Sequence, residues 1–291
     1  MLDTRICNST NNSEKVFLSQ FSNLLKTVLS APADFYREKY KKKGLKISFS
    51  DLPDNLNYDF LRELPIVTRQ ELALTFYHDR IYGEGPAVYK LIKSPEAERS
   101  FLLHRTVDEI KKSGLPINGK RPLVLMGDIY EALEHCVYIY EQNLIPLIGE
   151  IPNSELIFSV SKQYEADSIF LDRYSIDHYK HDLIRAKLPL KSITLIDSQF
   201  CYTDWHWPEG IIIDYILSLP ETGRLAFKCP ESNRDMDFVF HPFNDVFIEP
   251  GIAVITSSRL QACPMIRYQT NILLYSVAGS CSCGIPSFRL G

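Results

Sequence analysis

The stretch 121-RPLVLMGDIYEALEHCVYIYEQNLIPLIG-149 decides the fold class of this chain. A short apolar run opens it, the amphipathic segment 128–143 follows, and a second apolar run closes it. Short runs that are apolar throughout are typical of strands buried on both faces, and the amphipathic segment has the length of a crossover helix. The stretch therefore predicts a β-α-β unit with parallel strands and a right-handed connection.

The same alternation continues downstream of this stretch. The amphipathic segment 153–166 precedes an apolar run at 167–172, and the helical pattern at 175–187 precedes another run at 190–197. Because successive β-α units place their strands side by side and their helices on the faces, this region predicts a parallel sheet with covering helices.

Different patterns flank this α/β core. The chain before it is rich in helical patterns, among them a capping box formed by Thr68 and Glu71. After residue 222 the helical patterns end and short strands follow, with a hairpin predicted around Pro250. We therefore expect an α/β fold in two parts: a helical start plus the α/β core in residues 1–222, and a β-rich module in residues 223–291.

Composition and charge narrow the range of partners and compartments. The chain has 291 residues with 45% hydrophobic content, a net charge of -4 and a pI near 6.0. An acidic chain without a basic stripe is a poor ligand for a phosphate backbone, so we expect no nucleic-acid partner. Its start lacks the pattern of a secretory signal, and it has no apolar stretch of about 20 residues. We expect a cytoplasmic protein with no membrane contact.

Seven cysteines are the most informative residues of the chain. In a reducing cytoplasm they are interpreted as buried residues, metal ligands or reactive thiols rather than as disulfides. Cys281 and Cys283 are one residue apart and precede Gly284, which favours a tight turn that points both thiols at one cation. Cys229 and His241 stand at the ends of two predicted strands. The four residues predict a Cys₃His set that binds a structural zinc ion.

The alternative is that the spacing arose by chance. In that interpretation Cys229 is a small core residue, His241 is a hydrogen-bonded histidine at a strand end, and the two C-terminal cysteines belong to an ordinary loop. Three other cysteines, Cys7, Cys201 and Cys263, have no partner at ligand spacing, and Cys136 is on the apolar face of a predicted helix. We expect these four to be packed or surface residues.

Several short stretches resemble phenylacetate-CoA ligase and its relatives in the adenylate-forming superfamily. The stretches are LPIVTRQEL at 64–72, LPETGRLAFKC at 219–229, HPFNDVFIEP at 241–250, CPMIRYQTN at 263–271 and CSCGIPSFRLG at 281–291. The resemblance implies an adenylate-forming ligase-like fold and the activation of an acyl or aryl carboxylate. It also implies that Cys229, His241, Cys281 and Cys283 are zinc ligands, as in some relatives.

The resemblance implies a nucleotide site as well. Glu221 corresponds to the magnesium ligand, and Thr222, Arg267, Tyr268 and Thr270 correspond to residues that frame the substrate and nucleotide. If the protein is active, ATP and magnesium are its cofactors and a small carboxylic acid is its substrate.

The chain departs from the family pattern at its nucleotide contacts. The family's phosphate loop is rich in Ser, Thr and Gly, whereas residues 91–105 contain no glycine. Ile272 stands where the family has its ribose-binding aspartate, and Leu217 where it has the adenine-stacking tyrosine. An isobutyl or sec-butyl side chain cannot accept a hydrogen bond from a ribose hydroxyl.

The resemblance also concerns the end of the sequence. Gly291 corresponds to the start of the hinge that leads to the family's C-terminal domain, so the domain with the catalytic lysine is expected to be absent. That domain, or another protein partner, would then act from a separate chain. Two hypotheses follow: a ligase-like enzyme with degenerate nucleotide motifs, or a non-catalytic, zinc-stabilised binding or scaffold protein of the same fold.

Overall fold

The computed structural model describes residues 10–45, 47, 52, 56–83, 87–92, 100–112, 115, 117–149, 154–198, 209–229, 239–277, 281, 283 and 285–291. The described residues form two compact units. The first unit consists of residues 110–229, and the second consists of residues 10–109 and 239–291. We describe each unit by itself.

The first unit contains the predicted parallel sheet. Its strands are β3 (Pro122–Leu125), β4 (Leu147–Ile148), β5 (Ser168–Asp172), β6 (Ser192–Asp197), β7 (Ile212–Leu219) and β8 (Gly223–Lys228). They lie in the order β8-β7-β6-β5-β3-β4, parallel from β7 to β4, and β8 pairs antiparallel with β7. The α/β prediction is confirmed, since the fully apolar runs become the central strands, whose side chains are buried on both faces.

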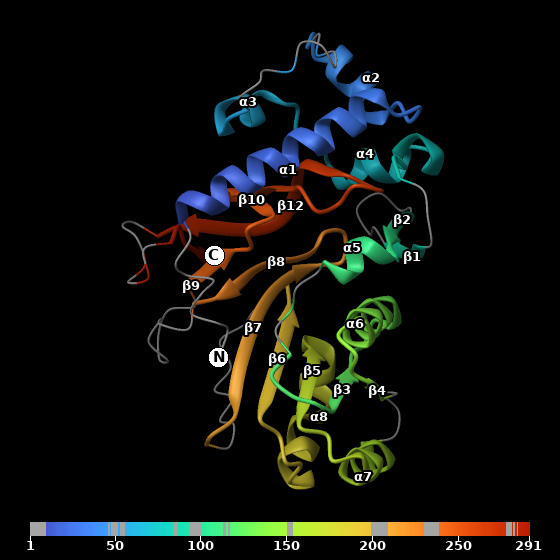
Figure 1. Cartoon of the computed structure of the whole chain (residues 1–291), viewed down its shortest axis with the longest axis vertical. Coiled ribbons are helices and arrows are strands. Elements are labelled where there is room, and N and C mark those ends of the chain that lie inside the picture. The colour runs from blue at the N-terminus through green and yellow to red at the C-terminus, as the bar shows by residue number, and fades with distance from the viewer. Residues whose placement is uncertain are drawn as a thin grey trace. The chain divides into compact units, whose positions relative to one another are not determined.

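Three helices connect these strands, and aspartates at the strand ends fix where two of them begin. They are α6 (Ile129–Glu141), α7 (Ser154–Tyr164) and α8 (Arg173–Ala186). Asp128 caps α6 by accepting from two amides of its first turn, and Asp172 caps α8 through the amide of Ser175. In the first unit α6 packs on β3, and α8 packs on β5, β6 and α7 (Figure 1).

The second unit contains the β-rich end of the chain. Its strands are β9 (Val239–Pro242), β10 (Val246–Glu249), β11 (Gly251–Ser257), β12 (Met265–Ser276) and β13 (Phe288–Leu290), which pair antiparallel in the order β10-β11-β12-β13-β9. The predicted hairpin around Pro250 joins β10 to β11. Gly251 has a φ of 97° there, a conformation that costs glycine little.

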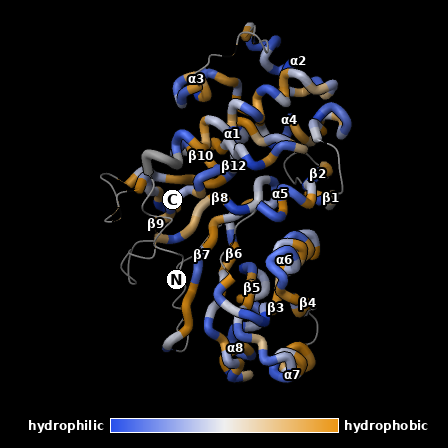
Figure 2. Tube along the Cα trace, viewed as in Figure 1, coloured by the Kyte–Doolittle hydropathy of each residue, from blue (hydrophilic) through white to orange (hydrophobic). Residues whose placement is uncertain are grey.

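The helical start of the chain packs within this second unit. Its elements are α1 (Thr10–Ser30), α2 (Phe35–Lys42), α3 (Tyr58–Glu63), α4 (Arg69–Leu74) and a 3₁₀ helix, η3 (Tyr77–Arg80). Hydrophobic and hydrophilic residues alternate along α1 (Figure 2), and its apolar side enters a core shared with β12. The division expected at residues 222 and 223 stays a prediction; the structure adds that residues distant in sequence share one core.

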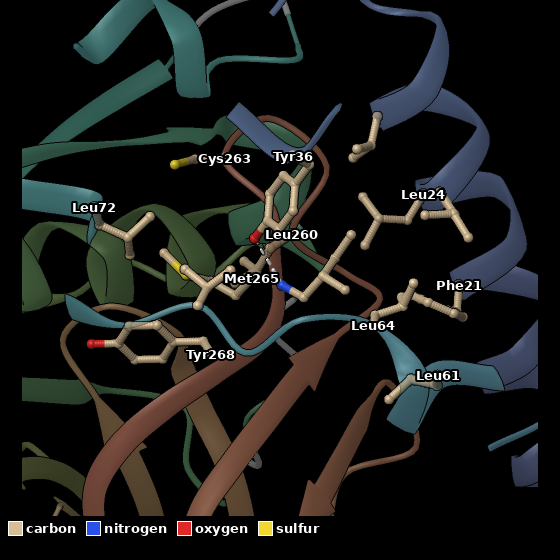
Figure 3. Packing of buried hydrophobic residues seen from close by; sticks show 14 of the residues in the cluster. Phe21, Leu24, Tyr36, Leu61, Leu64, Leu72, Leu260, Cys263, Met265 and Tyr268 are labelled. Atoms are coloured by element: carbon tan, nitrogen blue, oxygen red, sulfur yellow. Dashed lines mark hydrogen bonds between the residues drawn. The ribbon is translucent and has the colours of Figure 1, made fainter. Parts of the chain in front are cut away.

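Tyr36 on α2 shows how the start and the end of the chain are joined in that core. Its hydroxyl donates to the carbonyl of Pro264 at 2.8 Å and accepts from the amide of Ile266 at 3.0 Å, although about 230 residues separate the partners in sequence (Figure 3). Met265 and Tyr268 of β12 lie in the same apolar cluster (Figure 3). Burial raises the pKa of Tyr36 well above its usual range, so its hydroxyl keeps its proton and its donor role.

The second unit also contains a hairpin that the sequence pattern did not predict. Strand β1 (Ala87–Ile92) pairs antiparallel with β2 (Phe101–Thr106), and the short helix α5 (Val107–Lys111) follows.

The capping box expected at Thr68 and Glu71 is present at the start of α4. Among the described residues, none of the helices is both long and apolar enough to span a lipid bilayer.

Candidate metal centre and the predicted nucleotide residues

The four predicted metal ligands lie together in the structure. One ligand atom from each of Cys229, His241, Cys281 and Cys283 can be chosen so that all four lie within 4.8 Å of one another. Thiolates bound at about 2.3 Å to one tetrahedral zinc ion would be separated by about 3.8 Å, so these side chains are within small adjustments of a zinc geometry. The set could therefore bind a metal such as zinc.

Local structure brings each ligand to this point. Cys229 directly follows β8, and His241 lies on β9 with its side chain fully buried. Cys281 and Cys283 precede β13, which pairs with β9 and so returns the end of the chain to the strand that carries His241. Ser282 and Gly284, the latter expected to permit the tight turn, lie outside the described residues.

The His241 imidazole is oriented by the protein in the way that metal binding requires. Its Nδ1 lies 3.0 Å from the carbonyl oxygen of Pro286, which can only accept, so Nδ1 carries the proton and donates. Its Nε2, which lies 3.2 Å from the sulfur of Cys283, then carries a lone pair directed at the cluster. Burial lowers the pKa of His241, with partial opposition from the Pro286 hydrogen bond, and thereby favours the neutral ring that metals bind.

The other described cysteines have different surroundings. Cys136 is buried on α6, and burial raises the pKa of its thiol to about 11. Cys263 is buried in the second unit, and burial again raises its pKa. Neither belongs to a group of ligands among the residues the structure describes, which agrees with their expected role as packed residues. Cys7 and Cys201 lie outside the described residues.

Glu221 and Thr222, the predicted magnesium ligand and its neighbour, occupy the tight turn between β7 and β8. Both side chains are buried, and the amide of Thr222 donates to the carbonyl of Leu219 at 3.2 Å. The hydroxyl of Thr222 donates to the carbonyl of Gly223 at 3.3 Å. Their role toward magnesium and nucleotide stays a prediction.

Arg267, a predicted nucleotide residue on β12, is engaged in contacts within the second unit. Its Nε and Nη2 donate to the two carboxylate oxygens of Glu249 at 2.8 and 2.9 Å. Its Nη1 donates to the carbonyls of Arg62 and Leu64. A guanidinium whose three nitrogens all bind protein groups has little capacity left for a phosphate.

Tyr268 and Thr270 also face protein rather than solvent. Tyr268 is buried in the core cluster of the second unit (Figure 3). The hydroxyl of Thr270 donates to the carbonyl of Ala253 at 2.9 Å and accepts from the amide of Ile272 at 3.1 Å. Both of its hydrogen-bonding roles are thus used by backbone groups, one on the neighbouring strand β11 and one on β12 itself.

The positions that correspond to family nucleotide contacts are apolar and buried. Ile272 is 4% exposed on β12, and Leu217 is completely buried on β7. The stretch corresponding to the phosphate loop, residues 91–105, forms the end of β1 and all of β2 except Thr106, and residues 93–99 between them lie outside the described residues.

Two partner groups in these sites were not identified from the sequence. The Pro286 carbonyl orients His241, and the Glu249 carboxylate holds Arg267. Glu249 offered a weak signal, because a carboxylate just before a hairpin turn can face the neighbouring strands. A backbone carbonyl such as that of Pro286 offers none, since its direction depends on the path of the folded chain.

Comparisons with known proteins give matches by structure and not by sequence. No protein-family model matches the chain, and no curated protein sequence matches it. An open conformation of 2-hydroxyisobutyryl-CoA ligase in complex with 2-HIB-AMP and CoA superposes with a TM-score of 0.72 and 13% identity, covering 98% of this chain and 75% of that one.

Two further structures are similar over a smaller part of the chain. o-Succinylbenzoate CoA synthetase from Bacillus subtilis, bound with its product analogue OSB-NCoA, has a TM-score of 0.53 at 11% identity and covers 70% of this chain and 48% of that one. The N-terminal subdomain of Klebsiella oxytoca NpsA, in complex with anthranilyl-AMSN, has a TM-score of 0.50 at 11% identity and covers 72% and 65%. The chain is thus similar in fold to adenylate-forming acyl-CoA ligases, and identities this low establish the fold alone.

Proposed function

We propose that this protein is a zinc-stabilised binding or scaffold protein built on the fold of the adenylate-forming ligases, and that it does not turn over ATP. The observation that supports this most directly is the state of Arg267, whose guanidinium nitrogens bind Glu249, Arg62 and Leu64. A side chain whose donors are all occupied by internal hydrogen bonds stabilises the strands and has none left for a ligand.

The buried apolar positions support the same proposal. Ribose recognition requires polar protein atoms that form hydrogen bonds with the ribose hydroxyls. Binding is weakened strongly when one of the two hydrogen-bonding partners is missing. Ile272 and Leu217 contribute only hydrocarbon to the interior at the corresponding positions. Thr270 satisfies its hydroxyl on the backbone.

The zinc ion would be structural in this proposal. Cys229, His241, Cys281 and Cys283 offer four protein ligands, a number that fills a tetrahedron and leaves no position for a reacting water. The ion would secure the last residues of the chain to β9 through His241. Its binding free energy would then appear as stability of the β-rich strands.

A second candidate is an active ligase of the phenylacetate-CoA ligase type, which would activate an acyl or aryl carboxylate with ATP and magnesium. It is supported by the fold shared with 2-hydroxyisobutyryl-CoA ligase and by Glu221, a carboxylate held in the tight turn between β7 and β8.

Isothermal titration of the zinc-loaded protein with ATP and magnesium separates the two candidates. We expect no binding tighter than about 1 mM. Pyrophosphate exchange with a panel of alkyl and aryl carboxylates should likewise stay at the level of a protein-free control. The ligase candidate would instead be supported if ATP binds with a Kd below that limit and the binding is lost in Glu221→Gln, a substitution of nearly equal volume.

A further inference from the structure

A group of large apolar side chains is exposed in the first unit, at the end of the sheet where β4 lies. We call this group the edge patch; its side chains are 67%, 42%, 69%, 73% and 52% exposed and belong to Ile129, Leu133, Tyr140, Ile145 and Ile148. Taking about 200 Å² as the full surface of a large side chain, these fractions correspond to roughly 600 Å² of apolar surface in contact with solvent. The largest apolar patch of a typical monomer measures about 300 to 600 Å² and is often functional.

Helix α6 contributes a stripe to the edge patch. Ile129, Leu133 and Tyr140 are separated by four and seven residues, so they lie within about 40° of one another around the helix axis. Cys136 and Ile139, on the adjoining side of α6, are buried. Helix α6 is thus apolar on two adjoining sides, and only one of them is covered.

The edge of the sheet extends this stripe. The chain moves outward from β3 to β4 through α6 and returns to β5 through α7, so right-handed crossovers place the two helices on opposite faces of the sheet (Figure 1). A Cβ on Gly149 would lie 3.2 Å from the side chain of Ile157 on α7, so Gly149 faces α7. Because side chains alternate along a strand, Ile148 faces the side of α6. Ile145 lies in the segment that leads from α6 to β4.

The charges of α6 argue against a lipid surface as the partner of the edge patch. Helix α6 carries Glu131, Glu134 and Glu141 and has no lysine or arginine. Amphipathic helices that lie on membranes carry lysine and arginine beside their apolar side, because these residues are attracted by anionic headgroups. The three glutamates lie about 100° or more from the centre of the stripe, so they do not interrupt its apolar surface.

We propose that the edge patch is a self-association surface, which binds the same patch of a second copy of this chain about a two-fold axis. A standard interface buries about 800 Å² of each partner, of which about 60% is apolar, so it requires about 500 Å² of apolar surface per copy. The edge patch offers that area. A two-fold axis brings identical patches together, and an apolar patch is complementary to itself because no like charges meet. The proposal does not depend on whether ATP is bound or turned over.

The helices rather than the strands make the contact in this proposal. Strand β4 has two residues, and Pro146 directly before it has no amide hydrogen, so pairing with a further strand would add few hydrogen bonds. Two copies of α6 that pack antiparallel place Ile129 of one copy near Tyr140 of the other, with Leu133 close to the two-fold axis. Antiparallel packing also puts opposite ends of the two helix dipoles side by side.

Sedimentation velocity of the intact, zinc-loaded protein at concentrations from about 1 to 100 µM tests the proposal. We expect the weight-average mass to rise with concentration from the 33.5 kDa of one chain toward twice that value. A mass that stays at one chain up to the highest concentration overturns the proposal, whether or not the monomer binds phosphatidylserine vesicles or a different protein.

Two variants show whether the association belongs to the edge patch. Leu133→Lys and Tyr140→Lys each place a charge in the patch and should weaken the dimer at least tenfold. The matched control is Ile184→Lys on α8, because Ile184 is 40% exposed, close to the 42% of Leu133, and this variant should keep the dissociation constant of the parent protein. Circular dichroism checks that each variant is folded; if Leu133→Lys is not, Tyr140→Lys provides the test. A dimer of unchanged strength in the folded patch variants, or one that Ile184→Lys weakens equally, contradicts the proposal.

Discussion

The Nδ1 of His241 donates a hydrogen bond of 3.0 Å to the carbonyl of Pro286, and this contact decides which nitrogen of the ring faces the cysteines. Pro286 follows the Cys281–Cys283 segment in sequence and precedes β13, so the segment that carries two of the proposed ligands also orients a third. Hydrogen bonds of this kind raise the basicity of a metal-bound imidazole and fix its direction. The site is thus prepared for a cation by backbone as well as by side chains.

Cys283→Ser should lose most of the bound zinc, because a hydroxyl is a far weaker ligand than a thiolate. We expect well under one zinc ion per chain by elemental analysis and a loss of unfolding free energy on the order of 4 kcal/mol. The C-terminal strand should become sensitive to protease. The matched control is Cys136→Ser on α6, which should retain a full equivalent of zinc; equal zinc content in both variants would contradict the assignment.

The pair Arg267 and Glu249 should behave as a structural clasp. Their side chains are 12% and 16% exposed and are joined by two hydrogen bonds. A double-mutant cycle with Arg267→Met and Glu249→Gln, measured by urea unfolding, should give a coupling of about 1 to 3 kcal/mol. The exposed pair Arg62 and Asp59 provides the comparison, and its coupling should stay below about 0.5 kcal/mol.

Introducing the family's aspartate at Ile272 should destabilise the protein rather than restore nucleotide binding. Ile272→Asp places a carboxylate at a position that is 4% exposed, at an expected cost of about 3 kcal/mol or more. Leu273, the next residue of β12, is 39% exposed, so Leu273→Asp should lower the unfolding free energy much less. A gain of ATP affinity in Ile272→Asp, seen by titration calorimetry, would argue for an intact nucleotide site.

Glu71 should make the second unit more stable at neutral than at acidic pH. Burial alone would raise its pKa, but hydrogen bonds from Lys39 and Thr68 outweigh burial and lower it below its usual value. A lowered pKa in the folded state means that the contribution is present above the unfolded pKa and is lost as the pH falls through the folded one.

Glu71→Gln keeps an oxygen that can accept from the Thr68 amide but loses the charge that faces Lys39, so it should lower the unfolding free energy by at most about 1 kcal/mol at pH 7. The difference from the parent protein should shrink as the pH falls below about 4.5, the unfolded value. Glu63→Gln, an exposed change at the end of α3, should show no such trend. A pH-independent difference at Glu71 would mean that the charged form makes no stabilising contact with Lys39 or Thr68.

The sequence determined the elements that depend on neighbours along the chain. Apolar runs and amphipathic segments specify the parallel strands and helices between 121 and 197, because burial on both faces requires side chains that are apolar throughout. Thr68 and Glu71 fix the start of α4, because their hydrogen bonds span only three residues. The grouping of Cys229, His241, Cys281 and Cys283 was also predictable, since few residue types bind zinc and these four could do so; that they bind it stays a prediction.

Only the tertiary structure decided the relationships between residues that are distant in sequence. In the folded chain the Tyr36 hydroxyl accepts from the amide of Ile266, and the Arg267 guanidinium donates to the Glu249 carboxylate. The Arg80 guanidinium is buried over the ring of Phe101. The local sequence around either arginine is equally compatible with a side chain that is exposed to solvent and with one that binds a nucleotide. Which of these occurs depends on burial and on the direction of backbone carbonyls, and both are set by the packing of strands and helices rather than by local pattern.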